Sequence, residues 1–137
     1  MAVIEELIRE EETGALSFGN YELSSKTKKD GFSYNGDLYK IKTFNEITKL
    51  ERNGAFVYES VPGTTVHDFR ATDKEVDLKV EGTKDSQVTL ELEAEKEYKI
   101  HLDKIYVGKM KTNLGGKLNI NVELGDGKQV EIHIEKV

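Results

Sequence analysis

Length, composition and charge exclude several classes of protein. The chain has 137 residues, of which 36% are hydrophobic and 34% charged, with no cysteine, no tryptophan and a formal net charge of −6. Without cysteine there can be no disulfide framework and no cysteine zinc site, and net acidity argues against a nucleic-acid or anionic-membrane surface. We therefore expect one compact cytoplasmic unit that contacts neither nucleic acid nor membrane.

The first segment, residues 1–13, is predicted to be a short amphipathic helix. Its apolar residues recur at helical spacing, at Val3, Ile4, Leu7 and Ile8. Thr13-Gly14 then supplies a stop signal. A helix this short is marginal in isolation, so packing must hold it, on the chain's own sheet or on another chain.

Residues 14–65 are predicted to form an irregular β half. Ala15–Leu23 and Leu38–Phe44 are expected strands, and a solvated loop with Lys26, Lys28 and Lys29 lies between them. Asn45–Leu50 fits either a strand or a helical turn.

Two turn dipeptides and one proline divide this half further. Asn35-Gly36 predicts a tight hairpin turn because both positions must accept a positive φ, and Asn53-Gly54 repeats that chemistry before a strand at Ala55–Glu59. Pro62 cannot donate to a sheet ladder, so the segment around it is expected to be a loop or an edge.

Residues 66–137 are predicted to form a regular antiparallel half. After an expected strand at Val66–Ala71, apolar and polar residues alternate through five further segments, in which the apolar positions are Val76, Leu78 and Val80; Val88, Leu90 and Leu92; Tyr98, Ile100 and Leu102; Leu118, Ile120, Val122 and Leu124; and Val130, Ile132 and Ile134. Such alternation sends one set of side chains to a core and the other to water. The fold class is therefore predicted to be all-β, an antiparallel β-sandwich with a short N-terminal helix.

A further hairpin is predicted within this half. Asp103-Lys104 could close a tight turn, which would pair Leu102 with Ile105 and Ile100 with Val107. The glycine-rich segment Thr112–Lys117 precedes a strand rather than a helix, so it is expected to be a turn and not a phosphate-binding loop.

The polar residues do not predict a catalytic or metal site. His101 and His133 occupy outward positions and could be neighbours on an exposed face, but His67 is distant in sequence and no two ligands have close metal-binding spacing. Glu91, Glu93 and Glu95 form an outward stripe that is expected to pair with lysines across strands. We expect no metal, no cofactor and no catalytic residue, which leans against an enzyme.

Aromatic side chains are the remaining candidates for ligand contact. They are Tyr34, Tyr39, Phe56, Tyr58 and Tyr106. Rings on strands usually pack in a core, but these five could instead form a stacking platform for sugars or a surface for a protein partner.

Parts of the sequence resemble two known groups of proteins. The segment Tyr98–Val122 resembles the strand-turn-strand core of immunoglobulin-like modules appended to bacterial polysaccharide enzymes. Four further segments, Phe18–Leu23, Gly36–Phe44, Val57–Thr64 and Met110–Lys117, resemble a family of short bacterial proteins often labelled endosialidase-like. The first resemblance implies an immunoglobulin-like C-terminal half, and the second implies cleavage of polysialic acid.

The residues argue against that cleavage. A sialidase site resembles three arginines gripping a carboxylate on a propeller with tryptophan-containing repeats, whereas this chain has Arg9, Arg52 and Arg70 and no tryptophan. The sequence therefore favours a non-catalytic protein that acts through protein contacts or self-association, by the N-terminal helix or an edge strand. The alternative is a carbohydrate-binding module or a sialic-acid-related protein.

Overall fold

The computed structural model describes residues 2–125 and 127–137. Within this part of the chain there are thirteen strands and no helix. The strands are β1 (Ile8–Glu10), β2 (Leu16–Phe18), β3 (Thr27–Tyr34), β4 (Asp37–Thr43), β5 (Thr48–Arg52), β6 (Ala55–Val61), β7 (Thr65–Ala71), β8 (Glu75–Glu81), β9 (Ser86–Glu91), β10 (Glu97–Leu102), β11 (Ile105–Lys111), β12 (Lys117–Val122) and β13 (Gln129–Lys136).

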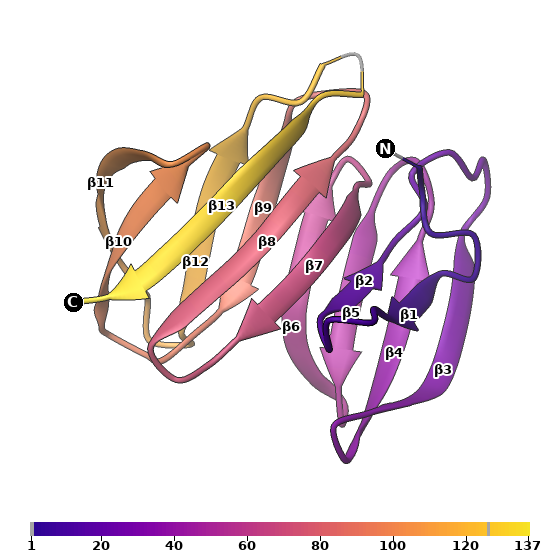
Figure 1. Ribbon diagram of the computed structural model, residues 1–137, viewed down its shortest axis with the longest axis horizontal. Helices are drawn as coiled ribbons and strands as arrows, with labels where there is room; N and C mark the ends of the chain where they lie inside the picture. The colour runs from indigo at the N-terminus through magenta and orange to yellow at the C-terminus, as the bar shows by residue number, and fades with distance from the viewer. Residues whose placement is uncertain (1, 126) are drawn as a thin grey trace.

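The strands form two antiparallel sheets that face one another as a sandwich (Figure 1). The seven-stranded sheet has the order β1-β2-β7-β8-β13-β10-β11, and the six-stranded sheet has the order β12-β9-β6-β5-β4-β3. Both sheets therefore contain strands from before and after Thr65, so the irregular and regular parts of the sequence share one architecture. The prediction of an all-β antiparallel sandwich is confirmed.

The alternation of apolar and polar residues in the sequence corresponds to the buried and outward faces of each sheet. In the central strands β8 and β13, Leu78 lies opposite Ile132 and Val80 opposite Val130, and all four side chains are buried. Side chains of successive residues leave a strand on opposite faces, so the polar residues between them point outward. The predicted inward positions of the regular strands are confirmed, with Leu92 and Leu102 partly buried at strand ends.

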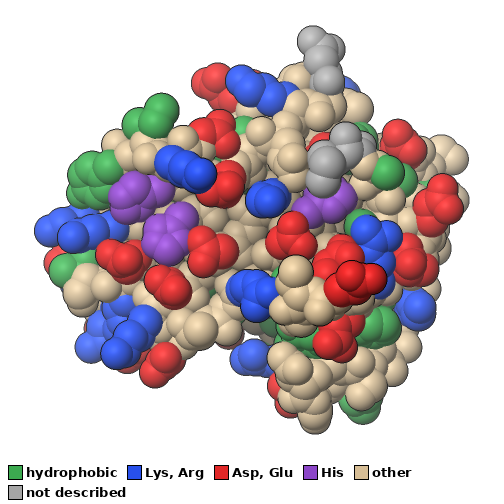
Figure 2. Space-filling model, viewed as in Figure 1, with side chains coloured by type: hydrophobic (Ala, Val, Ile, Leu, Met, Phe, Trp, Pro, Cys, Tyr) green, Lys and Arg blue, Asp and Glu red, His purple; other side chains and the backbone are tan. Residues whose placement is uncertain are grey.

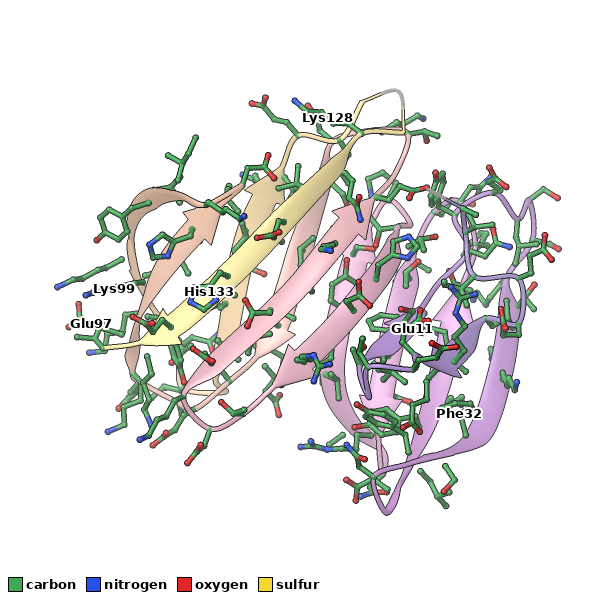
Figure 3. All side chains as sticks on the ribbon, in the orientation of Figure 1. Glu11, Phe32, Glu97, Lys99, Lys128 and His133 are labelled. Atoms are coloured by element: carbon green, nitrogen blue, oxygen red, sulfur yellow. The ribbon has the colours of Figure 1, made fainter. Side chains whose placement is uncertain are left out.

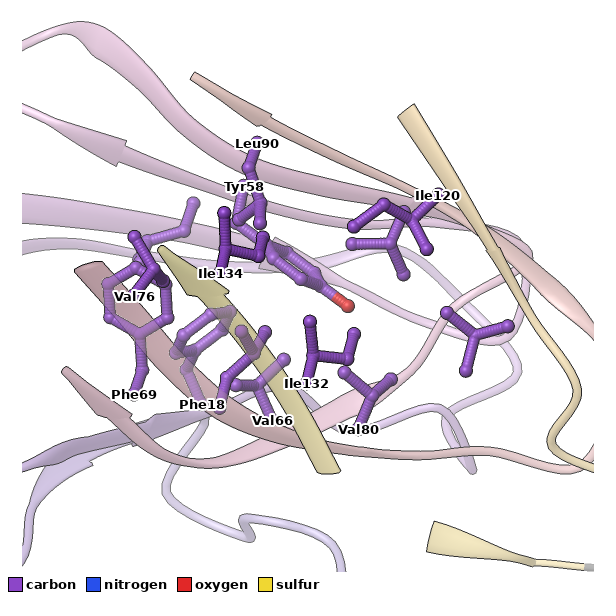
Figure 4. Packing of buried hydrophobic residues seen from close by; sticks show 14 of the residues in the cluster. Phe18, Tyr58, Val66, Phe69, Val76, Val80, Leu90, Ile120, Ile132 and Ile134 are labelled. Atoms are coloured by element: carbon purple, nitrogen blue, oxygen red, sulfur yellow. The ribbon is translucent and has the colours of Figure 1, made fainter. Parts of the chain in front are cut away.

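One hydrophobic core fills the space between the sheets (Figure 4). Phe18 packs edge-to-face against Tyr58 of the other sheet, with ring centroids 5.3 Å apart, and against Phe69 at 5.9 Å. Burying a large apolar side chain contributes about 1.5–3 kcal/mol to stability. Because Phe18 contacts rings from both sheets, this aromatic cluster ties the layers together.

A network of hydroxyl groups lies inside the same layer. The Tyr58 hydroxyl is hydrogen-bonded to Thr64 Oγ1 at 2.8 Å, and Ser60 Oγ is 2.7 Å from the same atom. Thr48 Oγ1 donates to the Thr64 carbonyl oxygen at 2.7 Å and is 2.8 Å from Thr43 Oγ1. All five side chains are buried, so each needs a partner within the chain. We call this set, Thr43, Thr48, Tyr58, Ser60 and Thr64, the hydroxyl network.

The predicted N-terminal helix over residues 1–13 is wrong. Instead Ile8–Glu10 forms β1, which pairs with β2 after a turn at Gly14, where φ is +89°. Ile4 and Ile8 are nonetheless buried, as a packed helix would also have required. The extended chain buries both residues and also joins the edge of a sheet, whereas a helix of this length has little stability of its own.

The lysine-rich loop and the strand before it also differ from the expectation. Lys28 and Lys29 lie in β3, the edge of the six-stranded sheet, where lysines discourage pairing with another chain. The strand expected over Ala15–Leu23 contains only Leu16–Phe18. Gly19 follows this strand; it has φ +97° and lies so close to Thr64 that an added Cβ would be 2.5 Å from the Thr64 carbonyl oxygen.

The predicted hairpin turns are confirmed. Asn35-Gly36 joins β3 to β4 and Asn53-Gly54 joins β5 to β6, with φ +50° and +81° in both turns. Asp103 and Lys104 likewise have positive φ, and Leu102 pairs with Ile105 as predicted. Ile100, however, pairs with Gly108 instead of Val107, because a bulge shifts the register of β11.

Candidate functional site

A cleft of about 550 Å³ lies at one end of the sandwich. The turns that surround it are at the lower side of Figure 1. The β3–β4, β5–β6 and β7–β8 turns, the end of β9 and the start of β10 surround it. The volume lies within the range of about 300–1,000 Å³ that is usual for small-molecule sites. Its lining combines aromatic and charged side chains from both sheets.

Five aromatic side chains line the cleft: Tyr34, Tyr39, Phe56, Phe69 and Tyr98. Tyr34 and Tyr39 meet edge-to-face with ring centroids 5.6 Å apart. The Tyr34 hydroxyl donates to the Gly14 carbonyl oxygen at 2.5 Å, which fixes the ring against the N-terminal turn. We call the five aromatic side chains the aromatic wall; at Tyr34 and Tyr39 it is held in place by contacts within the chain.

Arg52 is the cation that lines the cleft. It lies opposite Tyr39 in the register of β4 and β5, and its side chain is exposed. Burial raises the pKa of the Tyr39 hydroxyl, and the Arg52 guanidinium partly offsets that rise. The pair places a hydrogen-bond donor and a planar cation beside the aromatic wall.

Five carboxylates also line the cleft: Asp37, Asp73, Glu75, Glu91 and Glu93. Glu91 pairs with Lys117 at 2.5 Å across β9 and β12, and Glu93 pairs with Lys136. The hydrogen bond from Lys136 holds the pKa of the Glu93 carboxyl below its usual range. A general acid needs the opposite shift, so Glu93 is suited to structural pairing and not to proton donation. The cross-strand pairing with a lysine that was expected for this acidic stripe is confirmed for Glu91, whereas Glu93 follows β9 and pairs with a lysine of the other sheet.

The structure brings together three of the five predicted contact residues. Tyr34, Tyr39 and Phe56 line the cleft. Phe56 is half-buried, and Lys117 Nζ lies 4.5 Å from the centroid of its ring. Tyr58 is 0% exposed in the core, so the expectation of an accessible ring is wrong for that residue. Tyr106 is 52% exposed but lies on β11, away from the cleft.

Sequence reasoning missed Arg52, Phe69 and Tyr98 as members of the cleft. Arg52 stands directly before the predicted turn Asn53-Gly54, so its place at a strand end was available from the sequence. Phe69 and Tyr98 carry no comparable signal, because their place depends on the order of strands in the sheets.

The histidines lie elsewhere, in two different settings. His101 and His133 are cross-strand neighbours on the outward face of the seven-stranded sheet, with ring centroids 5.6 Å apart, as alternation predicted. Figure 2 shows carboxylates beside a pair of neighbouring histidines on this face. His67, in contrast, is 5% exposed, and its Nε2 lies 3.3 Å from the buried carboxylate of Glu81.

His133 is held by Asp77. The distance between His133 Nδ1 and Asp77 Oδ1 is 2.6 Å, and this hydrogen bond raises the pKa of the imidazole.

Glu81, the buried partner of His67, also accepts a hydrogen bond from the Tyr21 hydroxyl at 2.8 Å. The absence of a metal or cofactor stays a prediction from sequence.

Compared with known protein families, curated proteins and solved structures, the chain matches none of them. In residues 2–125 and 127–137 no helix has the length and apolar character to cross a membrane. The cleft and the surfaces of the sandwich are therefore the features from which a function can be inferred.

Proposed function

We propose that this protein is a non-catalytic binding protein whose cleft takes a neutral oligosaccharide. The convergence of Tyr34, Tyr39 and Arg52 on a cleft of about 550 Å³ carries the proposal. Aromatic rings offer an apolar face to the C–H groups of a sugar ring, and planar polar side chains pair with its hydroxyls. Asn35 and Asp37, at the β3–β4 turn, add an amide and a carboxylate to the same lining.

Charge favours a neutral sugar over an acidic one. The lining has five carboxylates, and three cations, Arg52, Lys117 and Lys136, offset three of their charges. Two negative charges therefore remain at the cleft. The carboxylate of a sialic acid would meet this surplus and be repelled. Arg9 is paired with Glu6 and Glu11, and Arg70 donates to the Thr13 carbonyl oxygen, so both other arginines are engaged outside the cleft. The proposal accordingly includes no cleavage of polysialic acid.

The test compares oligosaccharides and variants by isothermal titration calorimetry. We expect binding to at least one neutral oligosaccharide from a glycan array, and weaker or no binding to its sialylated form. Arg52→Ala should reduce the affinity about tenfold or more, because loss of a charged hydrogen-bond donor costs about 1.5–3 kcal/mol.

Two control variants make the result specific to the cleft. Arg9→Ala removes the same charge from β1, and Tyr106→Ala removes a predicted contact ring on β11. Neither should change the affinity. A flat response across neutral and sialylated glycans, or an equal loss in all three variants, would overturn the proposal.

A second candidate function is self-association through β11. This strand ends the order of the seven-stranded sheet, and four of its large apolar side chains are exposed: Ile105, Tyr106, Val107 and Met110. An exposed apolar edge is a template for another strand. A second copy fits because Asp103 precedes this stretch and Lys109 and Lys111 follow it, so antiparallel pairing sets an acid of one copy opposite a lysine of the other.

Sedimentation velocity tests this candidate. It predicts a concentration-dependent dimer that Val107→Lys abolishes, while Leu38→Lys, at an exposed apolar position on β4, leaves the dimer intact. A monomer at all concentrations would remove the candidate.

The immunoglobulin-like character of residues 98–122 stays a prediction. In this segment β10 and β11 lie in one sheet and β12 lies in the other.

A further inference from the structure

A cluster of potential metal ligands lies on the outward face of β8 and β13, apart from the aromatic wall of the cleft. It consists of Glu75, Asp77, His133 and Glu135, which we call the histidine–carboxylate cluster. In the register of the two strands His133 lies opposite Asp77 and Glu135 lies opposite Glu75, so the four side chains share one face. Figure 3 shows His133 on this face of β13.

The distances suit a shared ion. One donor atom each of Glu75, His133 and Glu135 lie within 4.8 Å of one another, and His133 Nε2 is 3.7 Å from Glu135 Oε1. Around a tetrahedral zinc ion with bonds near 2.1 Å, ligand atoms are separated by about 3.4 Å. Glu75 and Glu135 are exposed, so small changes of their rotamers suffice to close this geometry.

Asp77 prepares His133 for that role. It binds Nδ1 at 2.6 Å, and Nε2 is the ring nitrogen that faces Glu135. Metal-binding histidines usually donate their other ring N–H to a carboxylate, which orients the ring and makes the free nitrogen a better ligand. The cluster therefore holds both a set of ligands and the group that positions one of them.

The charge of the cluster also favours a cation. Three carboxylates surround one imidazole, and Lys99 of β10 is the lysine opposite Glu135 in the sheet. Because an imidazole that binds a metal is neutral, the three carboxylates and Lys99 leave two negative charges, which a divalent ion would offset. An imidazole ligand selects transition metals over calcium or magnesium, which prefer a shell of oxygens.

We propose that the histidine–carboxylate cluster binds one transition-metal dication of the zinc type through His133, Glu135 and Glu75. This departs from the sequence prediction of no metal, which relied on ligands three or four residues apart. On a strand the equivalent spacing is two residues, as in His133 and Glu135, and the neighbouring strand supplies the third ligand.

The test is a titration of untagged, chelator-treated protein with Zn²⁺ alone, followed by calorimetry. We expect one ion per chain, with Ca²⁺ and Mg²⁺ binding far more weakly. Glu135→Gln should lower the zinc affinity at least tenfold, and Asp77→Asn should lower it about 10–100-fold through the orientation of His133. Glu75 also lines the cleft, so Glu135 is substituted to keep this site separable from the proposed saccharide site.

The matched control is Glu131→Gln, which removes another carboxylate from β13 two residues before His133. It should leave the zinc affinity unchanged. Circular dichroism establishes that each variant is folded, and His133→Gln serves if a variant at Asp77 does not fold. Any of three results would overturn the proposal: no saturable zinc binding, an affinity for Ca²⁺ equal to that for Zn²⁺, or a loss of zinc affinity in Glu131→Gln equal to that in Glu135→Gln.

Discussion

The hydroxyl network and the cleft lie between the same two sheets, and both contain tyrosines, yet they differ in how their polar groups are satisfied. In the hydroxyl network every side chain is buried and bonds to another part of the chain, as Tyr58 bonds to Thr64. In the cleft, Arg52 and Asp73 are exposed and line an open space. The difference indicates that the first region stabilises the fold, whereas the second leaves polar groups open to solvent, as the proposed binding site requires.

The environment of each tyrosine expresses this difference. Burial raises the pKa of Tyr58 to about 12, and hydrogen bonds with Thr64 and Ser60 partly offset the effect. Tyr39 is also buried, but its partner is Arg52, which lines the open cleft. A substitution in the network should therefore reduce stability, and one in the cleft should act mainly on binding.

The largest effect is expected from Tyr58→Ala. It removes a fully buried ring that packs on Phe18 and leaves a cavity, so it should lower the free energy of unfolding by about 3–5 kcal/mol. Urea denaturation followed by circular dichroism measures this. A loss below about 1 kcal/mol would mean that Tyr58 is not part of the packed core.

A smaller loss is expected from Thr64→Val, which keeps the shape of the side chain. It removes Oγ1, the shared partner of the Tyr58 and Ser60 hydroxyls, and leaves buried polar groups unpaired. The free energy of unfolding should fall by about 1–3 kcal/mol. The exposed Thr83→Val is the control and should be neutral. If both variants are equally stable, the network contributes no stability.

Tyr34→Phe tests the wall of the cleft. It removes the hydrogen bond to the Gly14 carbonyl oxygen. Because Gly14 is only half-buried, water can replace the lost donor, and the free energy of unfolding should fall by only about 0.5–1.5 kcal/mol. Denaturation midpoints of this variant and Thr64→Val, measured side by side, should rank them in that order. The reverse order would contradict the division between network and cleft.

The smallest effect concerns pH and Glu93. Because Lys136 lowers the pKa of this carboxyl from 4.5, its stabilising charge is present above pH 4.5 and is lost as the pH falls through the lowered pKa. The stability difference between the wild type and Glu93→Gln should therefore be small at neutral pH and vanish in acid. Thermal melts across this range measure it, with Glu95→Gln as the control. A difference that grows in acid would exclude the ion pair.

Much of the fold could be predicted from the sequence because its regular strands are half-buried. Alternation from Val76 to Ile134 and the turn residues Asn35-Gly36 each have one physical explanation. The helix prediction for residues 1–13 was wrong because buried Ile4 and Ile8 are compatible with both a helix and an edge strand. Which of the two forms depends on pairing with the neighbouring strand of the sheet.

The candidate sites were less predictable because they depend on strand order. Alternation placed His101 and His133 on one face, but Glu75 joins them only because β8 lies beside β13. The cleft likewise needs three turns and two strands to meet at one end of the sandwich. The cytoplasmic location and the choice between protein and carbohydrate partners stay predictions.

An amide chemical-shift titration with the oligosaccharide selected on the array would locate the binding site on the sandwich directly. If the open end of the sandwich is the binding site, the largest changes should occur at Asn35, Arg52 and Thr72, which lie in or directly beside its three turns. The amides of Ser60 and Thr64 in the hydroxyl network should not move. Changes confined to Ile105–Lys111, or none at saturating sugar, would contradict the account.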